Sequence, residues 1–346
     1  MGRIAFFILA LGLASACSDS GSNPFDRPDQ TPDDDAGDGT GDGTGDDGTP
    51  IDSDRTLPPG TASPSPDTSI FRREARGESG TGYAESVTYD AATDTFSVDN
   101  LAFDGDNAYT RDDQVGTLNG FAVYENNSSF PDPLTGNPVA QLDHKALYLV
   151  SPSGQSEVAI VRTGSYRDYG FGGFIYQRNG GVTLPATGQA IYTGNYAALR
   201  DFQGSGGIEY AQGDMNIQID FDDFNQAGGV LGSVTNRRVF DTAGVDITDS
   251  ILQALETENG VNYTALPTLL FVVTDAALDA NGEITGTLDS TVATDNGPEI
   301  YESGNYYAVM SGDNAEEIAG VIVVTADDPR FDDVTVRETG GFLVNR

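Results

Sequence analysis

Thiol, imidazole and amine side chains are almost absent from this sequence of 346 residues. It holds one cysteine, Cys17, one histidine, His144, one lysine, Lys145, and no tryptophan. A lone cysteine cannot form an internal disulfide, and zinc sites draw on several His or Cys ligands. The sequence therefore excludes a disulfide framework, and we expect neither a metal site nor a cofactor.

Positive charge is also scarce. Lys and Arg together number 17 against 54 Asp and Glu, which gives a net charge of -37. Such a surface repels nucleic acid, whose phosphates need basic contacts. The excess of acid either keeps the protein in solution in salty surroundings or attracts a basic partner, and charge alone leaves both readings open.

The side chains available for catalysis are few. No nucleophile-elbow motif supports a Ser-His-Asp triad around His144, which lies at the start of an expected strand. The acids Asp220, Asp222 and Asp223 are stronger candidates, because on a strand Asp220 and Asp222 would share the outward face. They are either a glycosidase-type pair or an ordinary solvated face. We expect no catalytic residue, and the alternative is an extracytoplasmic hydrolase that uses this Asp pair.

The N-terminus has the features of an export signal that ends in a lipid attachment site. The apolar run over residues 4–13 is too short to span a bilayer but suits a signal peptide. Small residues at 14–16 then precede Cys17, as in the bacterial lipobox, where the cysteine is acylated and becomes the new N-terminus. Residues 1–16 are therefore predicted to be a lipoprotein signal peptide, and Ser18 favours the outer membrane.

An acidic tether is predicted over residues 17–68. Its segment 33–50 contains only Asp, Gly, Thr, Pro and one Ala, and it has no apolar periodicity. Such a segment cannot bury enough surface to offset the entropy of ordering it. A flexible chain of this length would hold the folded part about 40 Å from the lipid. The Asp-Gly pairs also suggest calcium repeats, but these need a regular apolar position that is absent here.

Short alternating runs from about residue 80 onward predict an all-β fold. Apolar side chains at Met215, Ile217, Ile219 and Phe221 alternate with polar ones, which is the period of a half-buried strand. Turns between strands are predicted at 90–94, 151–154, 281–282 and 311–314, and the chain ends in a strand at 341–346.

One short helix is predicted after residue 248. Thr248 or Asp249 can cap its start, and Gly260 can end it. Ile251, Leu252 and Leu255 would share its buried face.

A glycine- and aromatic-rich segment occupies residues 166–176. Its glycines do not precede a helix, so it is not a phosphate-binding loop. Its rings form either a ligand surface or, as we predict, a core where two parts of the fold meet, with the glycines allowing close packing. The rings in question are Tyr166, Tyr169, Phe171, Phe174 and Tyr176.

Several segments together resemble the barrel region of transferrin-binding protein B and related bacterial surface lipoproteins. The opening strand, 184–196, carries Gly188, Ala190, Tyr192 and Gly194 in the family's Gly-x-Ala-x-Tyr-x-Gly pattern. An alternating strand at 213–221 and Gly-Ser-Val-Thr-Asn at 232–236 follow. The hairpin at 312–321 contains Ala-Glu-Glu as in the family, and the chain then closes on Gly-Gly-Phe at 340–342.

This resemblance implies an eight-stranded antiparallel β-barrel over residues 184–346, preceded by a β-rich handle domain over residues 80–181. It also implies display on the outer membrane by a lipid anchor, often with the help of a surface-lipoprotein translocator, and capture of a protein or solute ligand, as in nutrient or metal acquisition. Two functions stay open: a non-catalytic capture protein and the hydrolase. The ligand-binding residues are unknown at this point, because ligand loops vary within the family.

Overall fold

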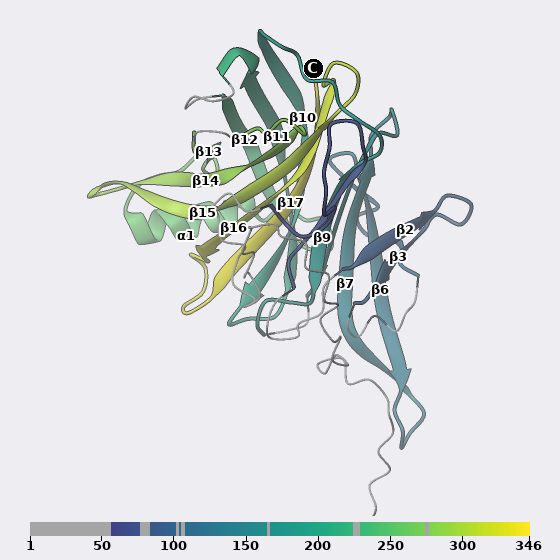
Figure 1. The fold of residues 1–346 in the computed structure, drawn as a ribbon. Helices are drawn as coiled ribbons and strands as arrows, with labels where there is room; N and C mark the ends of the chain where they lie inside the picture. The colour runs from purple at the N-terminus through teal and green to yellow at the C-terminus, as the bar shows by residue number, and fades with distance from the viewer. Residues whose placement is uncertain are drawn as a thin grey trace, which may run out of the picture.

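The computed structural model describes residues 57–76, 84–101, 104, 108–164, 167–223, 229–273 and 277–346. The predicted signal peptide (1–16), Cys17 and residues 17–56 of the predicted tether lie outside the described residues. The described part of the chain is built from β-strands with a single α-helix, which confirms the all-β prediction (Figure 1).

Eight antiparallel strands close into a barrel, as predicted. In chain order they are β10 (Gln189–Gln203), β11 (Ile208–Asp220), β12 (Val230–Phe240), β13 (Leu269–Phe271), β14 (Glu283–Thr294), β15 (Gly297–Ser311), β16 (Glu317–Asp327) and β17 (Thr335–Asn345). The C-terminal strand completes the ring because Phe342 lies opposite Gly320 of β16 on one side and Tyr196 of β10 on the other.

The interior of the barrel is apolar. Met215, Ile217 and Ile219 of β11 point inward and are at most 2% exposed, whereas Gln218 between them is exposed. This confirms the alternation read from the sequence. Phe221 is also buried, but it lies in the short 3-10 helix η1 (Phe221–Asp223) rather than on the strand.

Aromatic rings fill the interior because facing positions are glycine. A methyl group at Gly232 would lie 2.4 Å from the ring of Phe271. That ring stacks on Tyr306, with centroids 3.6 Å apart and an interplanar angle of 8°. On the other side, a methyl group at Gly286 would lie 2.5 Å from the Tyr306 hydroxyl. The centre of the barrel is thus a packed core.

A seven-stranded antiparallel sheet, here called the handle sheet, lies beside the barrel (Figure 1). Its strands run in the spatial order β1 (Ile70–Arg73), β9 (Gly172–Arg178), β8 (Ser156–Thr163), β7 (Pro138–Val150), β6 (Phe121–Pro131) and β4 (Thr110–Arg111), and β5 (Thr117–Leu118) also pairs with β6. The hairpin between β7 and β8 confirms the turn predicted at 151–154.

A two-stranded ribbon covers the outer face of the handle sheet. It consists of β2 (Ser86–Asp90) and β3 (Thr95–Asp99), which pair across the predicted turn at 90–94. Phe96 is fully buried and lies 5.6 Å from Tyr124 and 5.3 Å from Tyr148 between ring centroids. Phe171, in the middle of the glycine-rich segment, belongs to the same cluster.

The inner face of the handle sheet packs on the outer wall of the barrel. Leu147, Ile160, Phe174 and Tyr176 from the sheet form one apolar cluster with outward-facing barrel residues such as Val321. Phe174 and Tyr176 are fully buried, which confirms that these rings form a core where two parts of the fold meet. The division into a handle (80–181) and a barrel domain (184–346) stays a prediction, and the shared core indicates that neither part buries its apolar surface alone.

Residues 57–69 lie against the sheet, although their composition assigned most of them to the tether. The Thr61 N–H donates to the Phe71 carbonyl at 3.0 Å, and the Val182 N–H donates to the Pro66 carbonyl at 2.7 Å. The ordered chain therefore begins earlier than composition predicts, because backbone pairing holds a segment that has little apolar content of its own.

The helix α1 (Thr248–Asn259) confirms the predicted element, including Gly260 in the left-handed conformation just after it. The predicted capping is wrong: Ile247 is the N-cap residue, and the Thr248 hydroxyl instead accepts the Val239 N–H at 2.9 Å. Tertiary contact with β12 has taken the side chain that sequence assigned to the cap. In the described part of the chain, no helix has the length and apolar character to cross a membrane.

A buried ion pair joins the handle sheet to the barrel. Arg72 of β1 donates two hydrogen bonds to Glu283 of β14, at 2.7 and 2.8 Å, and both residues are at most 6% exposed. Burial alone would lower the pKa of Arg72, but the hydrogen bonds and charge of Glu283 outweigh it, so the pKa is raised. Arg72 therefore stays charged, and the two buried groups depend on each other for their hydrogen bonds.

Breaking this pair should be costly. We expect Arg72→Met to destabilise the protein by about 3–5 kcal/mol, because Glu283 is left charged and buried without its partner. The double variant Arg72→Met, Glu283→Met should recover most of that loss, since neither charge is then buried. Urea unfolding followed by circular dichroism measures both. Equal losses in the single and the double variant would contradict the interpretation.

Candidate functional site: a cleft at one end of the barrel

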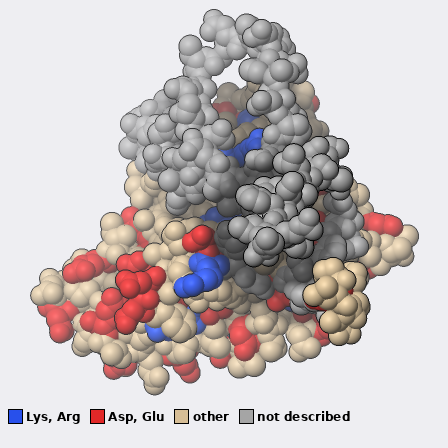
Figure 2. Space-filling view, turned by 90° about the horizontal axis from the view of Figure 1, so that it is seen from below, with Lys and Arg blue, Asp and Glu red and all other residues tan. Residues whose placement is uncertain are grey.

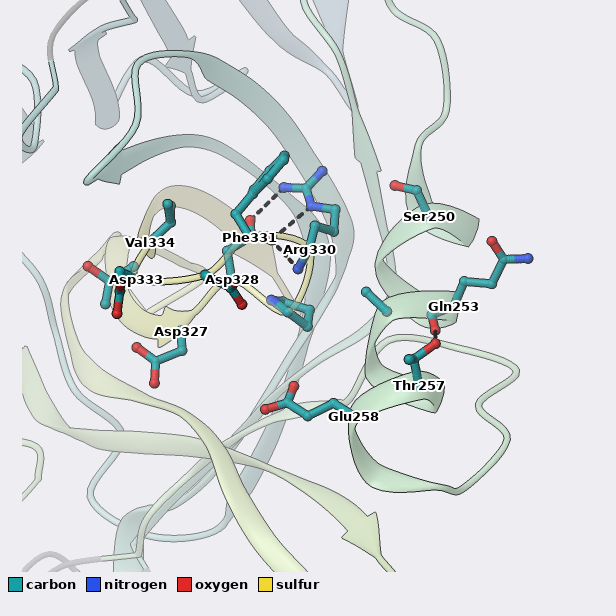
Figure 3. A pocket seen from close by; sticks show the side chains of 14 residues that line it. Ser250, Gln253, Thr257, Glu258, Asp327, Asp328, Arg330, Phe331, Asp333 and Val334 are labelled. Atoms are coloured by element: carbon teal, nitrogen blue, oxygen red, sulfur yellow. Dashed lines mark hydrogen bonds and ion pairs between the residues drawn. The ribbon is translucent and has the colours of Figure 1, made fainter.

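An open cleft lies between α1 and the loop that joins β16 to β17 (Figure 3). Its volume is about 970 Å³. One wall comes from α1, through Ser250, Gln253, Ala254, Thr257 and Glu258, and the other from the loop residues 327–335. The segments lie 69 or more residues apart in the sequence, so only the folded barrel brings them together.

The helix forms its wall because its two faces differ. Ile251, Leu252 and Leu255 are buried and belong to the core of the barrel. The side chains on the opposite face recur at the helical spacing of three and four residues, and they turn toward the cleft. Anchoring of the apolar face thus fixes the position of the polar one.

The loop wall is organised by Asp328 and Arg330. The Asp328 carboxylate accepts the Arg330 backbone N–H at 3.0 Å and two guanidinium hydrogen bonds at 2.9 and 2.6 Å. Arg330 also donates to Glu209 of β11 at 2.8 and 3.1 Å. At the base of the loop, Val334 packs with Phe202 and Val336. The loop is therefore held at its centre and at its end.

The exposed groups of the cleft are acidic and aromatic. Glu258, Asp327, Asp332 and Asp333 are exposed carboxylate residues, and Phe331 is 54% exposed. The guanidinium of Arg330, the basic side chain among the lining residues, is already paired with Asp328 and Glu209. The cleft thus presents negative charge next to an accessible ring, which favours cationic groups.

A chain of buried ion pairs runs from the interior of the barrel to this loop. Arg237 donates to both oxygens of Glu302, at 2.6 and 2.7 Å, and to Glu338 at 3.1 Å. Glu338 is 3.4 Å from Arg200, whose guanidinium donates to Glu209 at 2.6 Å. Because Glu209 also binds Arg330, the cleft loop is linked to the barrel core by alternating charges.

Arg237, Glu302 and Asp328 stay ionised although they are buried. Burial raises the pKa of Glu302, but the Arg237 guanidinium and the Ser290 hydroxyl outweigh it, so the pKa lies below its usual range. Burial lowers the pKa of Arg237, and the carboxylates of Glu302 and Glu338 more than reverse this. The pKa of Asp328 is likewise lowered, since the hydrogen bonds from Arg330 outweigh its burial.

The sequence offered His144 and the acids Asp220 and Asp222 for catalysis, and the structure places His144 in the handle sheet and the acids at the end of barrel strand β11. His144 is fully buried in the middle of β7, not at its start, with its ring 6.0 Å from that of Tyr109. Asp220 ends β11, and Asp222 lies in η1, so the prediction that they share a strand face is wrong. Asp222 is exposed and accepts the Gly188 N–H at 3.1 Å, while Asp220 accepts the Gln189 side chain at 2.6 Å. Both organise turns at the surface, and the side chain of Asp223 lies outside the described part.

Among the residues described, no group of His, Cys, Asp and Glu is arranged to hold a metal ion. Of the rings in the glycine-rich segment, Tyr166 lies outside the described residues. Tyr169 is half-buried and donates to Thr335 at 3.0 Å.

Sequence reasoning missed the cleft. The run Asp-Asp-Pro-Arg-Phe-Asp-Asp at 327–333 was visible as a polar turn, and the helix at 248–259 was predicted. A phenylalanine inside an acidic turn was the signal that could have marked it, because a ring in such a place has no local core to enter. The helix and the loop lie opposite each other only because the barrel closes. Neither segment by itself predicts that closure.

Comparison with known proteins gives fold-level matches. No protein-family model matches the sequence, and no curated protein is significantly similar to it. Among solved structures, a transferrin-binding protein B mutant from Haemophilus parasuis Hp5 is 12% identical, with a TM-score of 0.33 over 75% of this chain and 44% of the other. Intact Ap-TbpB is 14% identical, with a TM-score of 0.33 over 72% and 43%. A surface lipoprotein is 12% identical, with a TM-score of 0.28 over 56% and 79%.

The eight-stranded barrel that the resemblance in the sequence implied is present in the structure. The chain spans less than half the length of the transferrin-binding proteins that it matches. TM-scores and identities this low carry no argument about ligand or function.

The pair between Asp328 and Arg330 should stabilise the loop in a pH-dependent way. Because the pKa of Asp328 is lowered in the folded state, its stabilisation is present above its unfolded pKa of about 4 and is lost as the pH falls through the folded pKa. We expect Asp328→Asn to cost about 1–3 kcal/mol at pH 7, and less below about pH 4. Urea unfolding at both pH values measures this.

Asp332→Asn is the matched control, because Asp332 is exposed and its substitution removes the same charge from an acidic protein. Its effect should stay within about 0.5 kcal/mol at both pH values. A loss for Asp328→Asn that is equal at the two pH values would show that ionisation of Asp328 is not its source.

Proposed function

We propose that this protein is a non-catalytic lipoprotein that is anchored through Cys17 at the outer membrane, faces the cell exterior and captures a cationic ligand in the cleft between α1 and residues 327–335. The open cleft with its acidic rim and exposed Phe331 is the observation that carries the proposal. The signal sequence and the acidic tether support the anchored location.

The cleft is a better binding site than the interior of the barrel. Lipocalin-type barrels hold a ligand inside, but here the stacked rings of Phe271 and Tyr306 occupy that space. Glycines opposite these rings leave no room even for a methyl group. A ligand therefore has to bind at the surface, and the cleft is a concave surface with a few polar groups and a ring, as binding sites require.

The chemistry of the cleft favours guanidinium or ammonium groups. The chain has a net charge of -37, and Figure 2 shows several patches of acidic side chains on the described part of one face, so a positively charged ligand is attracted over a distance as well as at contact. Phe331 can then lie against the cation or against its aliphatic stem. A ligand of this kind is either a basic segment of a protein or a cationic solute.

Catalysis is not part of the proposal. His144 is enclosed in the handle sheet, and the acids Asp220 and Asp222 hold surface turns, so neither offers a reacting group in the cleft. The proposed location also includes delivery by a surface-lipoprotein translocator.

Cys17→Ser should abolish lipid attachment and release the protein from the membrane. The serine hydroxyl does not replace the thiol that accepts the lipid. Metabolic labelling with a clickable palmitate, followed by separation of membranes from soluble material, measures both effects. Equal labelling of the wild-type protein and the variant would refute the anchor.

Binding to the cleft can be measured with an arginine-rich peptide as the probe and a glutamate-substituted peptide of equal length as its counterpart. We expect the first to bind and the second not to bind. Asp332→Asn with Asp333→Asn should weaken binding about fivefold, since exposed ion pairs contribute about 0.2–1 kcal/mol each. Phe331→Ala should weaken it about twofold to fivefold through loss of the cation–ring contact, since such a contact contributes about 0.5–1 kcal/mol at an exposed site. Isothermal titration calorimetry gives the Kd values.

The control variant is Asp313→Asn with Glu299→Gln, which removes the same charge from exposed sites outside the cleft. If it weakens peptide binding as much as the cleft variant does, binding follows net charge and the proposed site is wrong.

A further inference from the structure

The single lysine of the chain lies in the contact between the handle sheet and the barrel. Lys145 is in β7, and its ammonium nitrogen Nζ is 2.6 Å from Asp112 Oδ2 and 2.6 Å from Glu125 Oε2. Glu125 is its direct neighbour on β6, while Asp112 follows β4. An amine and two carboxyl groups thus meet in one buried place, and this amine belongs to the one lysine of the chain.

Asp112 is held in a fixed orientation. Its Oδ1 accepts the backbone N–H groups of Gln114 and Val115 at 2.7 and 2.8 Å. Its Oδ2, the oxygen next to Lys145, accepts the Tyr210 hydroxyl at 2.9 Å. The Asp112 N–H in turn donates to the Val123 carbonyl at 2.9 Å. One carboxyl oxygen therefore lies between two N–H donors, in the manner of an oxyanion hole.

The site is closed to water on the barrel side. The side chains of Lys145, Asp112 and Glu125 are 8%, 0% and 16% exposed. Val123 and Leu147, which neighbour Glu125 and Lys145 on their strands, belong to the apolar cluster that joins the sheet to the barrel, and so does Tyr210. Exclusion of water favours condensation over hydrolysis of its product.

We propose that Lys145 and Asp112 become joined by an isopeptide bond, with Glu125 as the catalytic residue that carries the proton. This is a covalent modification within one chain, and it is independent of the proposed ligand and of the lipid anchor.

The reaction balances without a further reagent. Glu125 takes a proton from the Lys145 ammonium and passes it to Oδ2 of Asp112, and the neutral Nζ then attacks Cγ of the protonated carboxyl group. The tetrahedral intermediate places its negative charge on Oδ1, between the N–H groups of Gln114 and Val115. Oδ2 leaves as water after it receives a second proton, which Glu125 carries from the attacking nitrogen. One C–N bond forms, one C–O bond breaks and one water is released.

The ion pair is the resting state before reaction. Burial lowers the pKa of Lys145, but hydrogen bonds to Asp112 and Glu125 outweigh it and raise the pKa. The pKa of Asp112 is lowered, since Lys145 and the two N–H groups outweigh its burial. Only the minor tautomer, with a neutral amine and a protonated carboxyl, reacts, so the bond forms slowly after folding. The fixed contact between the amine and the carboxyl group compensates for the small population of this tautomer, because effective molarities in such intramolecular reactions reach about 10⁵–10⁸ M.

The test measures peptide masses from the full chain. The purified protein is denatured and digested with pepsin, and its peptides are analysed by mass spectrometry. We expect a branched peptide that contains both Asp112 and Lys145 and is lighter than the sum of its parts by one water. An amine-reactive reagent applied to the denatured protein should label little Lys145. Lysine labelling reports on this residue because the chain has no other lysine.

Variants identify the groups. Glu125→Gln should abolish the loss of water and leave Lys145 open to the reagent. Asp112→Asn should still form the bond but lose one ammonia instead. Lys145→Arg keeps a cation between the two carboxylates and cannot form the bond, so it controls for folding, which circular dichroism confirms. If wild-type protein that has been aged after folding keeps a free Lys145 and the mass of the uncondensed peptides, the proposal is wrong. A bond mapped to a different carboxyl group would also refute it.

Discussion

One wall of the barrel is buried on both of its faces, and the remainder of the structure depends on this contact. The strands β15, β16 and β17 face the packed interior on one side and the handle sheet on the other, so Ile318 points into the barrel while Ala319 beside it meets the sheet. Residues 318–324 of β16 are buried without interruption. Residues 214–220 of β11 instead alternate between buried side chains and exposed or half-buried ones, because their outer side faces water. The outer surface of the barrel is thus apolar where it meets the handle sheet.

Buried ion pairs lie between the handle sheet and the barrel and at one end of the barrel interior. Arg72 and Glu283 join sheet and barrel, and the alternating chain from Glu302 to Arg330 connects the barrel interior to the cleft loop. Each pair costs desolvation, and its partner offsets that cost only while the geometry is kept. Such contacts specify one arrangement of the elements, in contrast to apolar surfaces, which tolerate sliding. The position of Arg330, and with it of Phe331 in the cleft, is therefore fixed from inside the barrel.

Local signals in the sequence predicted several of the strands, the turns at 90–94, 151–154, 281–282 and 311–314, and the helix, because those depend on alternation, on glycine and on asparagine within a few residues. The turn at Asn281-Gly282 and the strand that follows it are of this kind. Where tertiary contacts overrule local preference, the predictions were wrong. Thr248 bonds to β12 instead of capping its helix, and Asp222 enters a 3-10 turn because β11 ends at Asp220. The cleft and the Lys145 site could not be predicted, since each joins segments that meet only through barrel closure or sheet packing.

The strand β13 has only three residues, and it pairs with two residues on each neighbouring strand. The chain between Phe240 and Leu269 includes α1, whose apolar face packs in the barrel core together with Leu269 and Phe271 of β13. Apart from these core residues, the segment can change in length and composition without disturbing the ladders of the other strands, since few of them pair with it. The same segment supplies one wall of the cleft. The polar wall of the cleft can therefore change by insertion or deletion at one place in the barrel, while the other strands and their contact with the handle sheet stay the same.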